Sequence, residues 1–546
     1  MKKYINDLRE LLSNRIYIWS VIIISVISFG YAAFNSSISI DDTEYDRYVG
    51  SGNVMLSAGR FGIWFWSFIE GRWENSFLID VVAVFLFIFA CLNFCVLFKR
   101  VSDNKIGMGA LTVFSCLFIS YPLMNEIWEY TGANVNICGS FFLVSLSLLM
   151  LHSFIHNKKT LLSYLSLGGT ALLMMLVCAG YESVVPVYIF FVFAILALQI
   201  IYGEEKEKKF SNIIKQGLIY AGVLLAGLAL RLIVHRIILA VLNIPAAING
   251  ATQILWKTAT PKAIITQLFD DLFVKYIFRS VIYFPLLVFM LCGLAFLIMG
   301  IIACKKHGAI LLFTGFGMLL SLVILPLIQG VCAPYRTCQV IAAFCAFTAM
   351  MLISCFPKGV SKTKTVLRIC AISLCGLLCF YQASFLNFFL EINHRRSESE
   401  EVVVRQISYD LRSGFDQNKP VIFVGSHSLS PTYTEAVSIS ENSVRWNIYC
   451  RLCSKYYRLT GREFNMGALS RKLPESNINS VINWSITAFE SQDAMPKLFA
   501  YYGCAYVAAD FNTYWAPANE AAAEMPAYPE KGYIKDMGDY IIVNMQ

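Results

Sequence analysis

Eleven long apolar stretches constrain the fold of this chain more than any other feature. A helix needs about 20 apolar residues to cross the hydrocarbon core of a bilayer. Stretches of about that length predict membrane-spanning helices over residues 16–34, 77–98, 107–123, 136–155, 161–179, 184–202, 213–235, 281–303, 308–328, 338–356 and 366–386. Of the 546 residues, 57% are hydrophobic and only 15% are charged. A soluble fold could not bury that much apolar surface, so the sequence predicts an α-helical polytopic membrane protein.

The distribution of Lys and Arg predicts which ends of these helices face the cytoplasm. The odd-numbered loops, beginning with residues 1–15, carry 18 Lys and Arg, whereas the even-numbered loops carry 8 over about twice the length. Because basic loops stay on the cytoplasmic side, the N-terminus is expected inside. The formal net charge of +8 has the same explanation, so no nucleic-acid partner is expected. Residues 180–183 separate the fifth and sixth spans, which form either a tight hairpin or a re-entrant pair.

The last third of the chain has a different composition and predicts a separate domain. We expect a multi-span transmembrane catalytic domain over residues 1–391. Residues 392–546 contain no membrane-length apolar run, and an odd number of spans places them outside the cell. Three strand-like runs and two helical stretches predict a small extracytoplasmic α/β domain there, with strands in 418–428, 501–511 and 532–545 and helices in 398–411 and 444–459.

An acidic cluster follows the first predicted span. Asp41, Asp42, Glu44 and Asp46 lie within six residues and precede Arg47. Two adjacent carboxylates where a helix leaves the membrane can act as a general base for an incoming hydroxyl, or as ligands for a divalent cation such as Mg²⁺ or Mn²⁺. The alternative is a solvated loop with acids at a helix end. The density of acids and the aromatic run that follows favour the functional interpretation.

Several arginines lie in predicted outer loops among aromatic residues. Arg60, Arg72 and Arg336 are candidates for binding phosphate, because a guanidinium group can donate two parallel hydrogen bonds to phosphate oxygens. The alternative is that they anchor helices at the lipid headgroups, which would also explain the neighbouring Trp73. Arg336 favours a binding role, since it lies in a short turn between two apolar spans. The roles of Arg231, His235 and Arg236, near the end of the seventh span, stay open.

A second set of polar residues lies at predicted outer helix ends. Carboxylates beside aromatic rings are typical of sites that hold sugar hydroxyls and ring faces, and here the set consists of Glu126, Glu129, Tyr130, Tyr181 and Glu182. A capping or ion-pair role is an equal alternative. Polar groups at the edges of spans are costly unless they are paired or hydrated, so these clusters predict one shared cavity on the outer face.

The positions of the cysteines and the lack of known catalytic motifs in the sequence argue against several other chemistries. Most of the 17 cysteines stand singly in apolar helices, where a thiol packs as a small hydrophobic group. Cys450 and Cys453 lack a second pair at zinc-ligand spacing, and are expected to pack together or to form a disulfide with Cys504. The sequence contains no phosphate-binding glycine loop, nucleophile elbow or HExxH motif, so nucleotide hydrolysis and proteolysis find no support.

At Asp41-Asp42, Arg47 and the Gly59-Arg60 pair, the chain resembles the GtrII family of bacterial integral-membrane glucosyltransferases. The resemblance is strongest in the N-terminal third and extends to the many-span body, which is also similar to GT-C glycosyltransferases. It implies a location in the bacterial cytoplasmic membrane and an active site on the outer face. It also implies a polyprenyl-phosphate-linked sugar donor, a surface polysaccharide or other glycan acceptor, and an acidic residue in the first outer loop that is the catalytic base or a metal ligand.

Three functions follow from these observations. The first is an inverting GT-C-like glycosyltransferase, in which Asp41 or Asp42 deprotonates the acceptor and arginines bind the leaving lipid phosphate. The second is a flippase of lipid-linked sugars, which would favour charges at mid-membrane and repeated broken helices. The third is a membrane acyltransferase, for which only His235 among six histidines is suitably placed. The concentration of charges at one membrane face favours the first.

Overall fold

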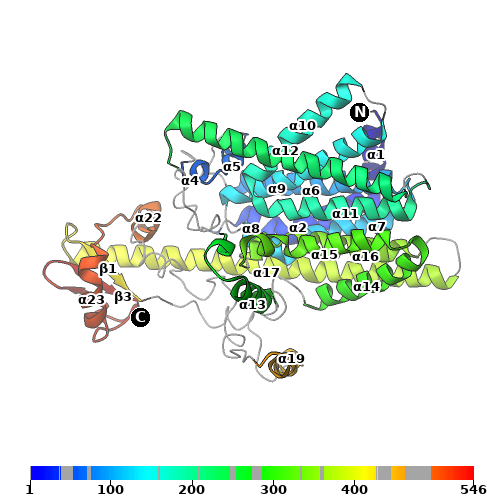
Figure 1. Ribbon diagram of the computed structural model, residues 1–546. Helices are drawn as coiled ribbons and strands as arrows, with labels where there is room; N and C mark the ends of the chain where they lie inside the picture. Colours follow the sequence, from blue (N-terminus) through cyan, green and yellow to red (C-terminus); the bar gives the residue numbers. More distant parts are fainter. Residues whose placement is uncertain are drawn as a thin grey trace. The chain divides into compact units, whose positions relative to one another are not determined.

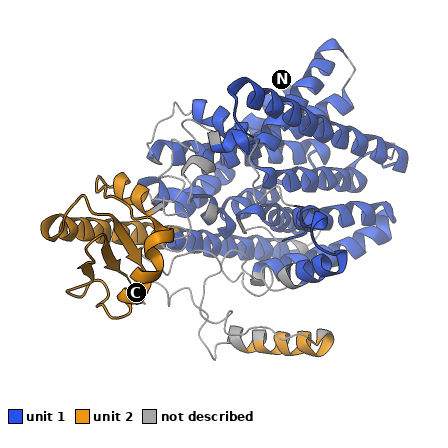
Figure 2. Ribbon diagram, turned by 60° about the vertical axis from the view of Figure 1, so that its left-hand side comes forward, with its two compact units in different colours: residues 1–34, 46–389 blue, residues 35–45, 390–546 orange. Residues whose placement is uncertain are grey.

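Two compact units make up the part of the chain that the structure describes (Figures 1 and 2). One contains the helices up to Phe389, and the other contains the chain from Leu390 onward. The computed structural model describes residues 2–35, 37, 53–69, 76–128, 131–157, 160–205, 208–245, 254–272, 286–331, 335–356, 362–425, 427, 444–461 and 494–545.

The first unit confirms the helical membrane fold. Within the described residues, nine helices are long and apolar enough to cross a membrane. They are α2 (Arg15–Phe34), α6 (Ser76–Val101), α9 (Thr131–His156), α10 (Leu161–Gly180), α11 (Val185–Tyr202), α12 (Phe210–Leu242), α14 (Leu286–His307), α15 (Ile310–Gln329) and α17 (Lys362–Gly414). Each coincides with a predicted span, and the membrane-length α10 and α11 support a hairpin of two spans between residues 161 and 202.

The other two predicted spans are shorter helices in the interior of the unit. They are α7 (Met108–Ile119) and α16 (Val340–Ser354), which pack against each other. Nearly all their side chains are buried. At about 1.5 Å per residue, α7 is only about 18 Å long, well short of the bilayer core of about 30 Å. Both are as apolar as a full span, because neighbouring helices surround them instead of lipid.

Short irregular elements lie where these helices end. After α7 come η2 (Pro122–Met124) and α8 (Asn125–Trp128), and both contact η7 (Tyr335–Thr337), which precedes α16. Between α10 and α11 lies η3 (Glu182–Val184). Ser183 of η3 donates a hydrogen bond of 2.7 Å to Gln339 at the N-terminus of α16. These contacts gather η2, α8, η3 and η7 at one end of the helical unit.

The described part of the first unit contains five further helices, all shorter than a membrane span. At the N-terminus, α1 (Lys2–Ser13) is held on α6 by ion pairs from Asp7 to Arg100, at 2.8 Å, and from Glu10 to Lys99, at 2.7 Å. The segment before α6 contains α4 (Asn53–Ser57) and α5 (Phe61–Ile69). The remaining short helices are η5 (Leu255–Lys257) and α13 (Pro261–Asp271).

A three-stranded mixed sheet forms the centre of the second unit. Its strand order is β1-β3-β2, with β1 (Val421–Val424) parallel to β3 (Ile541–Asn544) and β2 (Ile534–Asp536) antiparallel to β3. The predicted strand over 501–511 contributes only a bridge between Ala508 and Val421. The helices of this unit are the end of α17, α19 (Val444–Thr460), α22 (Ala494–Tyr501) and α23 (Phe511–Ala522). An α/β arrangement at the C-terminus is therefore confirmed.

Alternating side chains place helices on both faces of this sheet. Phe423 and Val543 share a core with α22 and with Val404 and Ile407 of α17, whereas Ile542 packs with α23 on the other face. The end of α17 is therefore an integral part of this core. The described cysteines are all free thiols, so of the two alternatives for Cys450 and Cys453 the disulfide with Cys504 is wrong.

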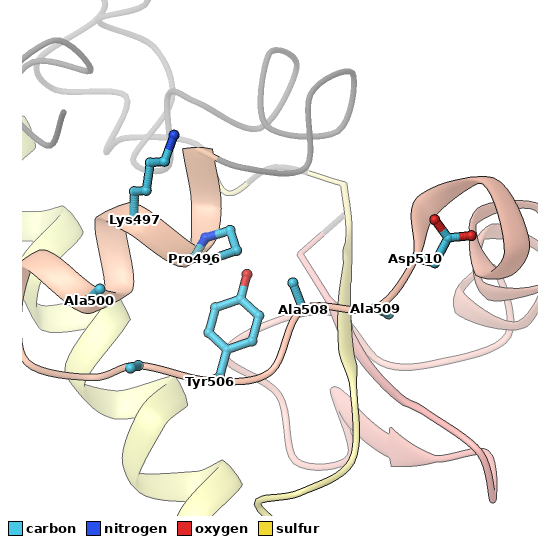
Figure 3. Close-up of a pocket in the computed structure, with 8 residues that line it drawn as sticks. Pro496, Lys497, Ala500, Tyr506, Ala508, Ala509 and Asp510 are labelled. Atoms are coloured by element: carbon cyan, nitrogen blue, oxygen red, sulfur yellow. The ribbon is translucent and has the colours of Figure 1, made fainter. Parts of the chain in front are cut away.

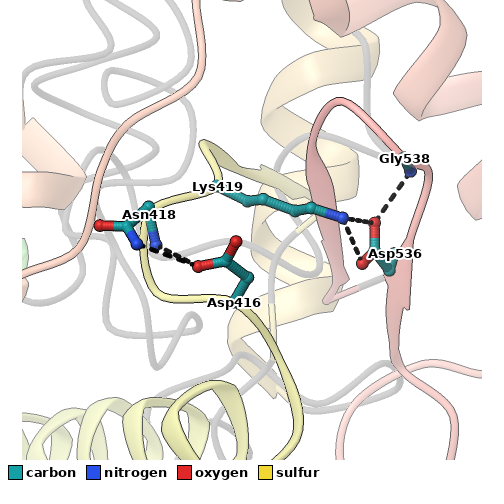
Figure 4. A network of polar contacts seen from close by, with 5 residues as sticks. All are labelled: Asp416, Asn418, Lys419, Asp536 and Gly538. Atoms are coloured by element: carbon teal, nitrogen blue, oxygen red, sulfur yellow. Dashed lines mark hydrogen bonds and ion pairs between the residues drawn. The ribbon is translucent and has the colours of Figure 1, made fainter.

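Polar contacts fasten the edges of the same unit (Figure 4). Lys419, just before β1, contacts both carboxylate oxygens of Asp536 in β2, at 2.9 and 2.7 Å. The Lys419 hydrogen bonds, followed by the Gly538 N–H, lower the pKa of Asp536. The Tyr533 hydroxyl donates to Asp410 of α17 at 2.7 Å. The Lys419 contacts therefore join the segment before β1 to β2, and the Tyr533 bond ties the segment before β2 to α17.

Candidate active site

The site is built on α5, which glycines bring close to the long helices. A Cβ on Gly62 would lie 2.6 Å from the Gly180 nitrogen, so α5 and the end of α10 meet with no room for a side chain. A Cβ on Gly139 of α9 would lie 2.3 Å from the Trp66 indole. On the other side of α5, Phe68 is exposed. This close packing fixes the position of Arg60, which immediately precedes α5.

Arg60, Glu182 and Arg231 form the charge cluster, which joins three separate parts of the chain. The Glu182 carboxylate lies 2.7 Å from Nη2 of Arg231 and 3.3 Å from Nε of Arg60. The exposed fractions of the side chains are 39% for Glu182, 26% for Arg60 and 17% for Arg231. Two guanidinium groups face one carboxylate, so the cluster keeps a net positive charge that an anion could neutralise.

Two neighbours orient the arginines. Arg231 also donates from Nε to the Gly59 carbonyl, at 3.3 Å. Gly59 adopts the left-handed conformation, with φ of 75°, which glycine reaches without strain. The Arg60 guanidinium lies 5.4 Å from the centre of the Tyr181 ring, in a cation–π contact. The His235 ring lies beside Gly59, since a Cβ there would be 3.1 Å from Nδ1.

A fully buried amide lies beside this cluster. Asn136 of α9 is 0% exposed, and neither its Oδ1 nor its Nδ2 has a hydrogen-bond partner among the described residues. Its Oδ1 lies against Gly180, 2.6 Å from the position of a Cβ there. A buried amide without partners costs free energy, and such a group in a native protein calls for a ligand or water to complete its bonding.

The predicted residue Arg336 lies at the same end of the helices. Its carbonyl oxygen accepts a hydrogen bond from Nε2 of Gln339, and Oε1 of Gln339 accepts the bond from Ser183. Ser183 directly follows Glu182, so this chain of bonds connects η7 to the segment that carries the charge cluster. Glu126 belongs to α8, which contacts η7.

The structure thus brings together Arg60, Tyr181 and Glu182, and places α8 and η7 at the same end. The other predicted site residues lie outside the described part of the chain, and these are Asp41, Asp42, Arg47, Arg72, Trp73, Glu129 and Tyr130. Among the residues that the structure does describe, no group of three or more His, Cys, Asp or Glu side chains is arranged to hold a metal ion. A role for Asp41 and Asp42 as metal ligands stays a prediction.

The sequence does not identify two members of the site. It leaves the role of Arg231 open between binding and anchoring, because Arg231 stands inside a long apolar helix with no nearby acid in the sequence. Its partner Glu182 is 49 residues away, and only the fold joins them. Asn136 is not among the predicted site residues. Its position is nevertheless a signal in the sequence, since an amide within a predicted membrane span is costly unless it has partners.

The second unit has a pocket of about 580 Å³ on α22 and the bridging segment (Figure 3). Lys497 and Pro496 come from α22, and the Tyr506 ring stands beside them. Asp510 forms the other end of the pocket, but its carboxylate accepts a hydrogen bond of 2.9 Å from the Thr513 nitrogen and caps α23. The single carboxylate in the pocket thus has a structural role, which makes the charge cluster the better candidate for catalysis.

Comparisons with known proteins place the charge cluster inside a recognised family region. The family model described as Glucosyl transferase GtrII matches residues 30–353. The match contains Arg60, Asn136, Glu182, Arg231 and Arg336, and it ends before α17 and the second unit. No curated protein and no solved structure matches the chain.

Proposed function

Because the chain belongs to the GtrII glucosyl transferase family, we propose that this membrane protein transfers a glucosyl group from a polyprenyl-phosphate donor to a surface polysaccharide or other glycan. The transfer takes place on the outer face of the bacterial cytoplasmic membrane, where a lipid-borne donor can meet an aqueous acceptor. The N-terminus is cytoplasmic in this proposal, and residues 392–546 lie outside.

The observation that carries the proposal is the net positive charge cluster of Arg60, Glu182 and Arg231. A phosphate ester is an anion with oxygens spaced to accept paired hydrogen bonds from guanidinium. Glu182 holds the two arginines near each other while neutralising only one of them. As the bond from the anomeric carbon to the phosphate oxygen breaks, negative charge grows on the departing polyprenyl phosphate, and both arginines stabilise it.

The acceptor hydroxyl needs a base on the opposite side of the sugar. We assign that role to Asp42 or Asp41, with Arg47, Arg72 and Trp73 completing the outer loop around the substrates. The carboxylate removes the proton while the acceptor oxygen bonds to the anomeric carbon, and polyprenyl phosphate leaves. A single displacement of this kind inverts the configuration. If a divalent cation takes part, Asp41 and Asp42 are the ligands.

The sugar itself needs hydrogen-bonding groups and a flat surface. Asn136 offers an amide that has no hydrogen-bond partner within the described ranges, and Tyr181 offers a ring beside the charge cluster. Glu126, Glu129 and Tyr130 continue this polar surface in the proposal, with Arg336 at its edge. A glucosyl group that bonds with Asn136 would satisfy the amide without exposing it to water.

Family membership also weighs against the two alternative functions. A flippase or an acyltransferase would share the membrane helices but not a match to a glucosyl transferase model over residues 30–353. One feature favours acyl transfer, namely that Nε2 of His235 is buried without a partner among the described residues. Replacement of His235 with Gln should leave glucosyl transfer within a few-fold of the original rate, whereas acyl transfer would be lost.

The proposed function can be tested with purified protein in liposomes. Polyprenyl-phosphate glucose with a radiolabelled sugar is supplied in the membrane, together with polysaccharide from the source cells. Transfer of the label to polysaccharide, with release of polyprenyl phosphate, is the expected result. Movement of the intact donor between leaflets without transfer would identify a flippase and refute the proposal.

A further inference from the structure

An apolar groove runs along the outside of the first unit between α11, α12 and α15. Its volume is about 330 Å³, within the range of about 300–1,000 Å³ that ligand sites occupy. Its walls are aliphatic and aromatic side chains with two tyrosines, among them Tyr188, Val192, Phe193, Tyr220, Leu224 and Phe313. These helices cross the membrane, so the groove is open to lipid and not to water.

The α12 wall of this groove lies on the same helix face as the charge cluster. Ile213, Gly217, Tyr220 and Leu224 line it at intervals of three and four residues. Arg231 follows Leu224 by seven residues, which is close to two helical turns, so its side chain continues the same stripe. With a rise of about 1.5 Å per residue, the groove begins about 10 Å from Arg231 along the helix.

Contacts between neighbouring helices join the groove to the cluster. The Tyr188 hydroxyl donates to the carbonyl oxygen of Tyr220, at 2.9 Å, which ties α11 to α12 at the groove wall. Glu182 lies in η3, which leads directly into α11, and it precedes Tyr188 by six residues. The helices that line the groove therefore carry or directly follow two of the three charged residues.

We propose that this groove holds the polyprenyl chain of the donor, with the donor phosphate on Arg231 and Arg60. This inference rests on the proposed function, since it assumes a donor with an anionic head and a long apolar tail. The structure matches that shape, because net positive charge lies at Arg231 and an apolar groove begins two helical turns away on the same face of α12.

In this proposal the groove mainly positions the donor and contributes little to the affinity of the protein for it. A polyprenyl chain leaves lipid that is as apolar as the groove, so burial brings no hydrophobic gain, and only close packing favours binding. The phosphate contacts supply most of the affinity. Filling the groove should therefore weaken the use of long-chain donors and leave short-chain donors unaffected, because a short tail ends before it reaches Leu224.

Gly217→Leu places a side chain in the groove. A Cβ at Gly217 would meet only Leu196, at 3.8 Å, which is an ordinary contact, so the added side chain can extend into the groove. The matched control is Gly222→Leu on the same helix, where nothing lies within 4 Å and the position is exposed away from the groove. Both variants gain the same helix propensity, so they differ only in whether the added leucine side chain points into the groove or away from it.

Transfer is measured with polyprenyl-phosphate glucose and with geranyl-phosphate glucose. Gly217→Leu should raise the KM for the long-chain donor about tenfold, as overpacking does, and leave the KM for the geranyl donor unchanged. Gly222→Leu should change neither. An equal effect of Gly217→Leu on both donors, or on neither, would overturn the groove assignment.

A photoreactive polyprenyl phosphate with a diazirine in its tail separates this inference from the proposed function. Adducts should form on α11 and α12 of the original protein. They should persist in Gly222→Leu and disappear in Gly217→Leu. An excess of phosphatidylglycerol should not reduce their amount. Adducts without any transfer by the original protein would refute the proposed function and keep the groove. Adducts spread over all helices, or displaced by phosphatidylglycerol, would refute the groove.

Discussion

Replacement of Arg231 with Gln tests the charge cluster most directly. In the described part of the chain two hydrogen bonds occupy this guanidinium, to Glu182 and to the Gly59 carbonyl, which leaves three of its five N–H groups for an anion. At 4 Å, a charge pair is worth about 1 kcal/mol in water and about 4 kcal/mol at an effective dielectric of about 20. The side chain is only 17% exposed, so the higher value applies before desolvation is subtracted.

The expected loss of activity follows from the charge that Arg231 would no longer supply to the phosphate. Removal of one donor that stabilises a developing anion costs about 2.7–4 kcal/mol, so kcat/KM should fall at least a hundredfold. The effect on stability should be small. Glu182 keeps Arg60 at 3.3 Å, and a partly exposed pair contributes less than about 1 kcal/mol to the free energy of unfolding. A large loss of activity with a small loss of stability therefore marks a binding role.

The measurement uses transfer from polyprenyl-phosphate glucose and thermal unfolding in detergent, for Arg231→Gln and for a matched control. Arg236→Gln removes the same charge from the same helix at an exposed position five residues further on. It should retain kcat/KM within about threefold, since exposed pairs contribute little. If both variants lost activity equally, or if Arg231→Gln altered only the unfolding temperature, the cluster would be structural and the assignment of the phosphate site would fail.

The other predictions concern catalysis, topology and the second unit. Asp42→Asn should reduce turnover by about 10²–10⁴-fold with unchanged expression, as expected for a lost general base. Asp41→Asn should have the same effect if the two carboxylates act together. Wild-type turnover in both variants would refute the mechanism. An engineered cysteine near Ser426 should react with an impermeant reagent from outside, and one near Lys206 should not; the reverse pattern would invert the topology. Residues 392–546, expressed alone, should be soluble and unfold cooperatively in a thermal melt, since their core includes the end of α17; a disordered fragment would show that they need the membrane unit.

Much of the fold follows from the length and polarity of the apolar stretches. Every predicted span coincides with an apolar helix, because a span must satisfy its own backbone hydrogen bonds in lipid. The sequence could not distinguish α7 and α16 from helices that face lipid, since both positions require apolar side chains. The bridging segment at Ala508 also differs from its prediction as a strand, because strand pairing depends on partners far away in the sequence.

The site was predictable only where a polar residue stood at a helix end. Arg60, Tyr181 and Glu182 are such residues, and in the structure Arg60 contacts both of the others. Arg231 and Asn136 stand within apolar helices, where the sequence alone does not show which side of the helix meets a neighbour. The glycines at 62, 139 and 180 decide this, since they let α5 approach α9 and α10 closely enough to place Arg60.

The short interior helices explain why such a site can exist at this end of the unit. Backbone that is not helical is tolerated at membrane depth only where protein covers it or where it lines a hydrated cavity. Here α7 ends early, and η2, α8, η3 and η7 follow or precede buried helices at the same end. Hydrogen-bonding groups gather there, including the bond between Ser183 and Gln339 and the amide of Asn136 on α9, which has no partner among the described residues. Under the proposed function, a glucosyl group brought to that end would find polar partners inside an otherwise apolar bundle, whereas the lipid chain of the donor would stay among apolar side chains.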